Sequence, residues 1–255
     1  MCFTDTHAHV YSEEFLNDSD ACFIRTIENN VTRIFVPNVD VDSILSLKDI
    51  CSKYKHNYYP MMGLHPCNVK EDYKEQLNII YEELISTKYY AVGEIGMDLH
   101  WDKTTFGIQE LAFIEQAKWA VKLDLPVSIH SREATSELIK IIKDNNLKKL
   151  KGVFHCFSGD EKEARELIGM GFYLGIGGVV TYKNSNLPQV LRKLGFDNLV
   201  LETDAPYLPP TPHRGKRNET SYIPLIAEKL AQIFEVSMAE IAEITTNNSK
   251  KLFGI

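Results

Sequence analysis

Eight short apolar runs recur along the chain, and a longer segment follows each of them. Parallel strands that helices cover from outside read as continuous apolar runs of this kind. Eight such β/α repeats within about 250 residues are typical of a (β/α)8 barrel, and this chain has 255 residues. The sequence therefore predicts an α/β fold, a TIM barrel built as a single domain over residues 1–255. The expected strands are Phe3–His9, Arg33–Val36, Tyr58–Gly63, Tyr90–Ile95, Val127–His130, Gly152–His155, Phe172–Ile176 and Leu199–Glu202.

Residues of the types that bind metals stand at the ends of five of these runs. His7 and His9 are two residues apart in an extended segment, so their side chains point to the same face. Taken alone, such a pair fits a polar turn, and His155 alone fits a half-buried core histidine. Imidazoles and carboxylates are, however, the ligands of divalent ions such as Zn²⁺, Mn²⁺ or Fe²⁺. The complete set predicts a metal centre, and its members are His7, His9, Glu94, His130, His155 and Asp204.

The positions of these six residues also decide between two kinds of α/β fold. An open, doubly wound sheet would spread them along a wide edge, and no Gly-rich phosphate-binding fingerprint opens a first helix here. In a closed barrel the carboxyl ends of the strands meet at one mouth, where barrel active sites lie. We therefore expect a barrel with the metal site at the C-terminal rim. Six ligands are too many for one tetrahedral ion and suit two ions that share a carboxylate.

Composition narrows the class of protein further. The chain has 44% hydrophobic and 25% charged residues, as a globular domain with a sizeable core does. No apolar run is long enough for a membrane span and no signal-peptide pattern opens the chain, so we expect a cytoplasmic protein without a membrane partner, and we favour a monomer. Five cysteines without a CxxC pair favour reduced thiols. The net charge of −7 is not that of a nucleic-acid coat protein, so local charge or metal must hold any anionic substrate.

Longer motifs surround the candidate ligands. In chain order they are Asp5-Thr6-His7-Ala8-His9, Gly63-Leu64-His65-Pro66, Gly93-Glu94-Ile95-Gly96-Met97-Asp98, His130-Ser131-Arg132-Glu133-Ala134, His155-Cys156-Phe157-Ser158-Gly159, Gly177-Gly178-Val179-Val180-Thr181, Glu202-Thr203-Asp204-Ala205-Pro206-Tyr207-Leu208 and Arg214-Gly215-Lys216-Arg217-Asn218-Glu219. With these motifs the chain resembles, over nearly its whole length, the TatD-like metal-dependent deoxyribonucleases of the amidohydrolase superfamily. The resemblance implies a TIM barrel, a divalent-metal centre and 3′-to-5′ exonuclease or related phosphodiesterase activity on DNA. Met97 stands where leucine is usual and Thr220 where proline is frequent, and these departures bear only on loop geometry.

The resemblance also implies roles for individual residues. One metal ion would be held by His7, His9, Glu94 and Asp204, and the other by Glu94, His130 and His155. The ions would be Zn, Mn, Mg or Fe.

The residue types add two distinctions within the superfamily. Many barrel amidohydrolases bridge their metals with a carbamylated lysine, whereas this chain offers the carboxylate of Glu94. We expect a metal-bridged hydroxide as nucleophile and Asp204 as its general base, so that Glu94 and Asp204 are the catalytic residues. Glu202 shares the inward face of Asp204. It either touches a metal or, in the interpretation that we favour, makes a hydrogen bond in the barrel core.

Further residues near the strand ends offer contacts to a substrate. Arg132 presents a fork of donors for a phosphate, or else forms a salt bridge at a helix start. His65 would touch a phosphate oxygen or cap the turn before the following proline. Trp101 and Tyr207 would stack on bases at the mouth, or pack against the rim. A basic cluster is either a footprint for a nucleic-acid backbone or an internally paired loop with partly structural arginines, and it comprises His213, Arg214, Lys216 and Arg217.

These features together predict a divalent-metal-dependent deoxyribonuclease that acts on DNA or another phosphodiester substrate. Two other classes stay open. One is a metal-dependent amidohydrolase of a small amide or ester, and the other is a metal-binding barrel without turnover. Arg132 and the basic cluster favour phosphate over amide, and the complete ligand set, with Asp204 included, favours turnover.

Overall fold

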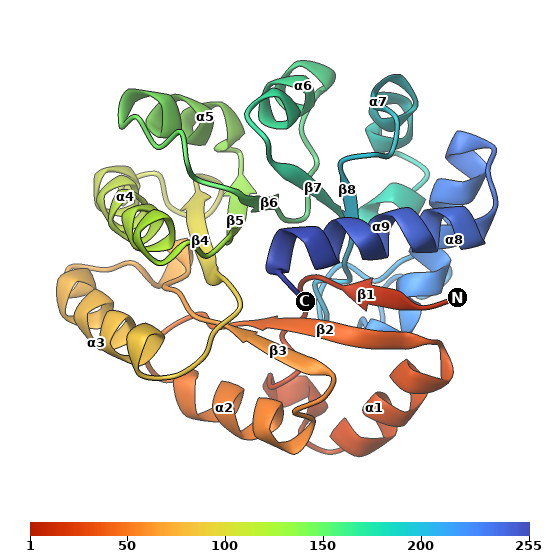
Figure 1. Ribbon diagram of the computed structural model, residues 1–255, viewed down its shortest axis with the longest axis horizontal. Helices are drawn as coiled ribbons and strands as arrows, with labels where there is room; N and C mark the ends of the chain where they lie inside the picture. Colours follow the sequence, from red (N-terminus) through yellow and green to blue (C-terminus); the bar gives the residue numbers. More distant parts are fainter.

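The computed structural model describes all 255 residues, and eight parallel strands form its centre (Figure 1). The strands are β1 (Phe3–Asp5), β2 (Val31–Pro37), β3 (Tyr58–Met61), β4 (Val92–Asp98), β5 (Val127–Arg132), β6 (Gly152–Phe154), β7 (Tyr173–Ile176) and β8 (Leu199–Leu201). Strands β1 to β3 form one hydrogen-bonded sheet and β4 to β8 form another. Within each sheet, neighbours in space are also neighbours in the chain, as in a barrel.

Two seams join these sheets into a ring. Just beyond β3, Met62 forms a parallel bridge with Val92 of β4. Just beyond β1 and β8, Ala8 forms a parallel bridge with Ala205. Backbone hydrogen bonds cross both seams, for example from the amide of Thr6 to the carbonyl of Leu201 at 2.9 Å. The predicted TIM-barrel fold is therefore confirmed, with short rather than continuous pairing at the seams.

Helices surround the strands and bury the outer faces of the barrel (Figure 1). They are α1 (Ser19–Glu28), α2 (Ile44–Lys53), α3 (Tyr73–Ser86), α4 (Phe106–Leu123), α5 (Thr135–Asp144), α6 (Glu161–Gly169), α7 (Leu187–Leu194), α8 (Ile223–Phe234) and α9 (Met238–Phe253). Short 3-10 turns occur at η1 (Glu13–Phe15), η2 (Pro66–Asn68), η3 (Gly178–Thr181) and η4 (Thr220–Tyr222). None of the helices combines the length and apolar character that a membrane crossing requires.

The last helix, α9, lies across the barrel instead of joining the outer ring (Figure 1). The side chain of Ser237 caps its start and accepts a hydrogen bond from the amide of Glu240 at 3.2 Å. At its end, the ring of Phe253 stacks on Phe35 of β2 with 3.8 Å between centroids. These rings belong to a small buried cluster that includes Val200 of β8 and is separate from the main core. The end of α9 therefore closes the barrel interior on one side, which leaves the other end for a site.

Several strands end earlier than the sequence predicted. β1 stops at Asp5 rather than at His9, and β8 stops at Leu201 rather than at Glu202. Two residues near the strand ends have left-handed backbone conformations, Cys156 with φ of 47° and Asp204 with φ of 57°. Such conformations turn the chain out of a strand pairing. Most ligand-type residues therefore lie on turns just beyond the strands.

Candidate metal centre

One oxygen of the Glu94 carboxylate, in β4, faces two of the predicted ligands. Glu94 Oε2 lies 3.0 Å from His7 Nε2 and 3.4 Å from His9 Nε2. Asp204 Oδ1 completes this group, at 3.9 Å from His7 Nε2 and 3.6 Å from His9 Nε2. All four residues are buried; Glu94 lies within β4, and the other three lie just beyond the ends of β1 and β8.

The other oxygen of Glu94 faces a second group. Glu94 Oε1 lies 2.8 Å from His155 Nε2 and 2.9 Å from His130 Nδ1, and these nitrogens are 3.2 Å apart. His65 Nε2 lies 3.3 Å from the same oxygen. Strands β4 and β5 come this close because of Gly96, which has φ of 142° and where a Cβ would lie 2.0 Å from the carbonyl oxygen of His130. Glu94 thus stands between two sets of donor atoms.

Two of these imidazoles have polar neighbours on the side away from Glu94. Ser128 Oγ lies 3.0 Å from His7 Nδ1. Glu202, which is fully buried, accepts a hydrogen bond from the backbone amide that follows His155, and its Oε1 lies 3.8 Å from His155 Nδ1. His155 Nδ1 and Glu202 Oε2 have no hydrogen-bond partner within the protein. Glu202 therefore lies behind His155, on the side away from Glu94.

Asp98 is a further member of the cluster that the sequence analysis did not assign. Its Oδ2 lies 2.9 Å from His130 Nε2, so that Nδ1 of the same ring is directed at Glu94. Its Oδ1 accepts hydrogen bonds from the amides of His100 and Trp101, at 3.0 Å and 3.2 Å. The spacing offered a signal: Glu94 and Asp98 are four residues apart in one strand, and alternation places both on the same face.

Burial and neighbouring charges shift the pKa values of the carboxylates and imidazoles in the cluster. Burial raises the pKa of Glu94, but neighbouring imidazoles, His155 above all, outweigh it and hold that pKa well below its usual range. Burial likewise raises the pKa of Asp204, and the hydrogen bond with His9 brings it below its ordinary value. Burial and the charge of His155 lower the pKa of His7 to about 4. At neutral pH both carboxylates are ionised and His7 is neutral, which are the forms that bind metals. Burial lowers the pKa of His9 and His130, but hydrogen bonds with Asp204 and Asp98 outweigh it and raise each pKa to about 9, so a metal must displace a proton from these two rings.

The spacing of the donor atoms fits a divalent-metal centre. Ligand atoms at about 2.0–2.1 Å from a tetrahedral ion are separated from one another by about 3.3 Å. Groups of three ligand atoms within 4.8 Å of one another occur here at His7–His155–Asp204, His7–His9–Glu94 and His65–Glu94–His130. Mixed imidazole and carboxylate donors suit Zn²⁺, Mn²⁺ or Fe²⁺.

A pocket of about 850 Å³ opens over the cluster at the mouth of the barrel, and both predicted substrate contacts line it. His65 Nδ1 accepts a hydrogen bond from the amide of Cys67 at 3.1 Å, which directs Nε2 toward the cluster. His65 therefore caps its turn and also faces the centre. Arg132 is exposed at the end of β5, with its guanidinium carbon 5.0 Å from the centre of the Trp101 ring. Its chain neighbour Glu133 pairs with His100 at 2.7 Å, so the alternative salt bridge to Glu133 does not form.

The basic cluster after β8 lies outside this pocket and is largely paired. Arg217 Nη1 lies 2.7 Å from Oδ1 of Asp18, which directly precedes α1, and Arg217 Nη2 lies 2.8 Å from Glu219 Oε1. The guanidinium carbon of Arg214 lies 4.2 Å from the centre of the Tyr182 ring. These contacts give both arginines a structural role, and the ion pair of Arg217 with Asp18 links the loop to the start of α1.

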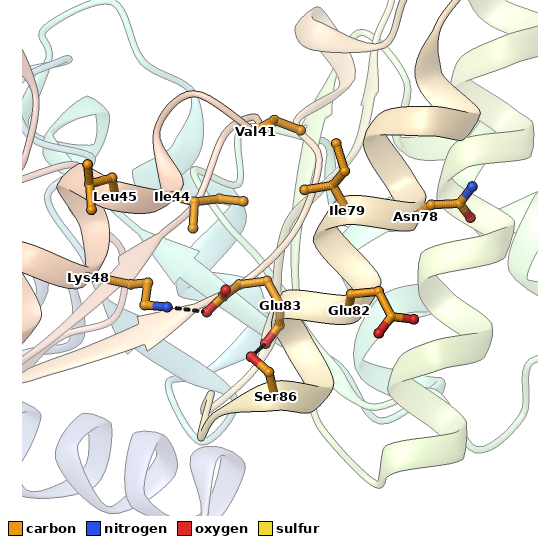
Figure 2. Close-up of a pocket in the computed structure, with 9 residues that line it drawn as sticks. All are labelled: Val41, Ile44, Leu45, Lys48, Asn78, Ile79, Glu82, Glu83 and Ser86. Carbon is orange, nitrogen blue, oxygen red and sulfur yellow. Dashed lines mark hydrogen bonds and ion pairs between the residues drawn. The ribbon is translucent and has the colours of Figure 1, made fainter.

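A second hollow, of about 790 Å³, lies on the outer surface between α2 and α3 (Figure 2). Lys48 Nζ and Glu83 Oε1 form an ion pair across it at 2.8 Å. It contains no histidine, and the residues that line it are Val41, Ile44, Leu45, Lys48, Asn78, Ile79, Glu82, Glu83 and Ser86. Of these two hollows, only the pocket at the mouth therefore combines open space with a set of metal-ligand atoms.

A parallel barrel that carries histidines and carboxylates around its mouth defines the class of TIM-barrel metal-dependent hydrolases. Within that class, the sequence matches the family model described as TatD related DNase over residues 4–254. The chain belongs to the TatD family.

Individual relatives agree with this assignment. The metal-dependent hydrolase YabD of Bacillus subtilis is 39% identical over 252 residues, which cover 98% of each chain. The 3′-5′ ssDNA/RNA exonuclease TatD of Escherichia fergusonii is 31% identical over 258 residues, again 98% of each. The crystal structure of YjjV, a TatD homologue from Escherichia coli, has a TM-score of 0.93 and 32% identity, and the match covers 99% of this chain and 98% of that one. The chain is thus a metal-dependent hydrolase of the TatD family.

Proposed function

We propose that this chain is a deoxyribonuclease that removes nucleotides from the 3′ end of a DNA strand, with two divalent metal ions held on either side of Glu94. One observation carries the proposal: the two oxygens of a single buried carboxylate face two separate sets of donor atoms. A bridging carboxylate between two ions is the arrangement that two-metal phosphodiester hydrolysis uses.

The ligands divide between the two ions as follows. The first ion would be held by His7, His9, Glu94 and Asp204. The second would be held by Glu94, His130 and His155. When bound, such a pair lowers the pKa of water and stabilises the negative charge that develops on a phosphodiester. Zn, Mn, Mg and Fe are the candidates for this centre.

Asp204 would accept a proton during hydrolysis, as the general base. Its carboxylate lines the pocket, and its pKa is held below the ordinary value, so it is ionised at neutral pH. A carboxylate beside the reacting water is the usual general base of such sites. His9 Nε2, at 3.6 Å from Asp204 Oδ1, keeps the carboxylate in place.

The charge and position of Arg132 favour a phosphate over an amide as the group that the pocket binds. Its guanidinium lines the pocket and has no carboxylate partner, because Glu133 pairs with His100. A guanidinium donates two parallel hydrogen bonds to phosphate oxygens. In a chain with net charge −7, this local positive charge beside the metal ligands gives a polyanion a place to bind. The 3′-to-5′ direction is taken from the relative in Escherichia fergusonii, whose name states it.

Metal analysis coupled to an exonuclease assay on 3′-labelled and 5′-labelled single strands tests the proposal. We expect a 3′ label to appear at once as a mononucleotide, whereas a 5′ label should pass through a ladder of shortening strands. Chelated protein should be inactive and regain activity on addition of metal. As a matched control, Lys48→Ala changes a charge in the outer hollow and should behave as the unmodified chain. If DNA stayed intact while a small cyclic amide or ester was hydrolysed, the amidohydrolase alternative would replace this proposal.

A further inference from the structure

Two aromatic side chains stand exposed on opposite sides of the mouth. Trp101 is 70% exposed and Tyr207 is 53% exposed, and both line the pocket over the cluster. Trp101 follows β4 and Tyr207 follows β8, which lie four strands apart in a ring of eight. The two rings therefore flank the metal-ligand cluster from opposite sides. The other tryptophan, Trp119, is only 7% exposed, as a packing role requires.

The backbone of each aromatic residue is anchored to the cluster, although its ring is free. The amide of Trp101 donates to Asp98 Oδ1 at 3.2 Å, and the other oxygen of Asp98 contacts His130. The amide of Tyr207 donates to the carbonyl of Asp204 at 2.8 Å, and the carbonyl of Tyr207 accepts a hydrogen bond from the side chain of Asn218 at 2.6 Å. The backbone that carries each ring is therefore held in place relative to the metal-ligand atoms.

Neither ring is packed against the rim in the manner of a core residue. The aromatic and cation–π contacts of Tyr207 and Trp101 are with other residues of the mouth. Tyr207 meets His9 edge-on with 6.0 Å between centroids, and Trp101 meets His100 and carries the guanidinium of Arg132 at 5.0 Å. An Arg–Trp contact places positive charge beside an aromatic face, the combination on which nucleic-acid strands bind.

We infer that Trp101 and Tyr207 are stacking platforms for unpaired bases on either side of the phosphate that occupies the metal centre. The inference rests on the proposed function and deepens it, because it makes a base-bearing single strand the substrate. Every base has an aromatic face, so stacking of this kind tolerates any sequence. A base inside a duplex is covered on both faces by its neighbours and is excluded from the platforms.

A binding titration tests this inference, with tryptophan fluorescence as the readout. The probes are a short phosphorothioate-linked oligothymidylate, which resists hydrolysis, and an abasic phosphorothioate strand of equal length. We expect the oligothymidylate to quench the metal-bearing protein and the abasic strand to leave it unchanged. Trp101→Phe should abolish the quenching, because the remaining Trp119 is buried.

Substitutions at the second platform separate stacking from a structural effect. Tyr207→Leu should weaken oligothymidylate binding about five- to a hundredfold, while Tyr207→Phe, which keeps the ring, should restore it. The same Tyr207→Leu change should leave the affinity for the abasic strand as it is, measured by the fluorescence anisotropy of a dye at the end of that strand. Leu45→Ser, at a side chain 69% exposed in the outer hollow, serves as the control and should change neither affinity. Equal binding of both strands, or equal weakening of both by Tyr207→Leu, would overturn the inference.

Hydrolysis of ordinary phosphodiester strands distinguishes failure of this inference from failure of the proposed function. Faster cleavage of the base-bearing strand than of the abasic strand supports the platforms. Equal cleavage of both overturns the platforms and leaves the nuclease proposal intact. Cleavage of neither strand by protein that carries its metals overturns the proposed function, and the inference with it.

Discussion

Two hollows of similar volume, about 850 Å³ at the mouth of the barrel and about 790 Å³ between α2 and α3, differ in the elements that line them. The mouth is lined by residues from the ends of separate strands, which meet although they are far apart in the sequence. The outer hollow is lined by the sides of two helices and the turn before α2 (Figure 2). Strand ends in a barrel bring many unlike donor atoms together, whereas the two helix flanks here offer a mixture of apolar and polar side chains without an imidazole. Volume alone therefore does not mark the site.

The two hollows also differ in how deeply their charged side chains are buried. At the mouth, the side chain of Glu94 is 2% exposed and faces several imidazoles, so each charge there depends on its partners. In the outer hollow, Lys48 is 47% exposed in its pair with Glu83, and water screens the interaction. Substitutions at the mouth should therefore have large effects on metal binding and activity. Substitutions in the outer hollow should have small effects on stability alone.

The largest effect is expected from Glu94→Ala. Because this carboxylate faces both sets of donor atoms, its removal should abolish metal occupancy and reduce hydrolysis to background. Metal content by elemental analysis and initial rates on single-stranded DNA provide the check. Circular dichroism should show that the variant is still folded. Retained activity would mean that another group bridges the ions.

Arg132→Ala should lower DNA hydrolysis about ten- to a hundredfold, because one charged hydrogen bond to phosphate contributes about 1.5–3 kcal/mol. Its metal content should stay unchanged, since a guanidinium is no ligand. Kinetics at two salt concentrations would separate this effect from that of Lys216→Ala, at an exposed lysine outside the pocket. The Lys216 variant should mainly reduce the salt dependence of binding to longer strands. An unaffected rate in Arg132→Ala would favour the small-amide alternative.

Asp98→Ala should weaken metal binding about tenfold or more, because Asp98 holds the His130 ring with Nδ1 directed at Glu94. Asp98→Asn keeps an acceptor for His130 Nε2 and should lose less. Competition with a fluorescent chelator measures both affinities without relying on turnover. Equal affinity in all three proteins would show that His130 needs no such support.

Arg217→Ala probes an ion-pair network of intermediate exposure, and its effect should depend on pH. The hydrogen bond from Arg217 holds the pKa of Asp18 well below its usual range. A depressed carboxyl pKa stabilises the fold above the unfolded-state value of about 4, and this stabilisation is lost as pH falls through the folded-state pKa. With Asp18 35% exposed and screened by water, we expect a loss of about 1–2 kcal/mol at pH 7 that shrinks below about pH 4. Urea unfolding at several pH values would measure it, and a loss that grew on acidification would contradict this origin.

Lys48→Ala should have the smallest effect. An exposed ion pair contributes about 0–1 kcal/mol to the free energy of unfolding. Metal content and DNA hydrolysis should be those of the unmodified chain, because the outer hollow offers no imidazole. A large loss of activity in this variant would break the distinction between the two hollows.

Much of the site was predictable because the apolar runs locate the strand ends, and barrel closure brings strand ends together. The pairing of Glu94 with His7 on one side and His130 on the other follows from that rule. The sequence carries no signal for Ser128 behind His7, since serine is common in any strand. For Asp98 the only signal is its spacing from Glu94 along one strand, which aspartates without a role also show. The strand boundary near Glu202 was wrong because the chain turns at Asp204, whose φ is 57°, and apolar patterns carry little information about single φ values. β1 also ends early, at Asp5, and no left-handed residue lies there to explain it.

The division of ligands around Glu94 is the central claim, and anomalous scattering from crystals grown with Zn²⁺ or Mn²⁺ tests it most directly. We expect two peaks on opposite sides of the Glu94 carboxylate. One should be surrounded by His7, His9 and Asp204, and the other by His130 and His155. A single peak, or two peaks away from Glu94 with these side chains splayed apart, would contradict the two-metal centre.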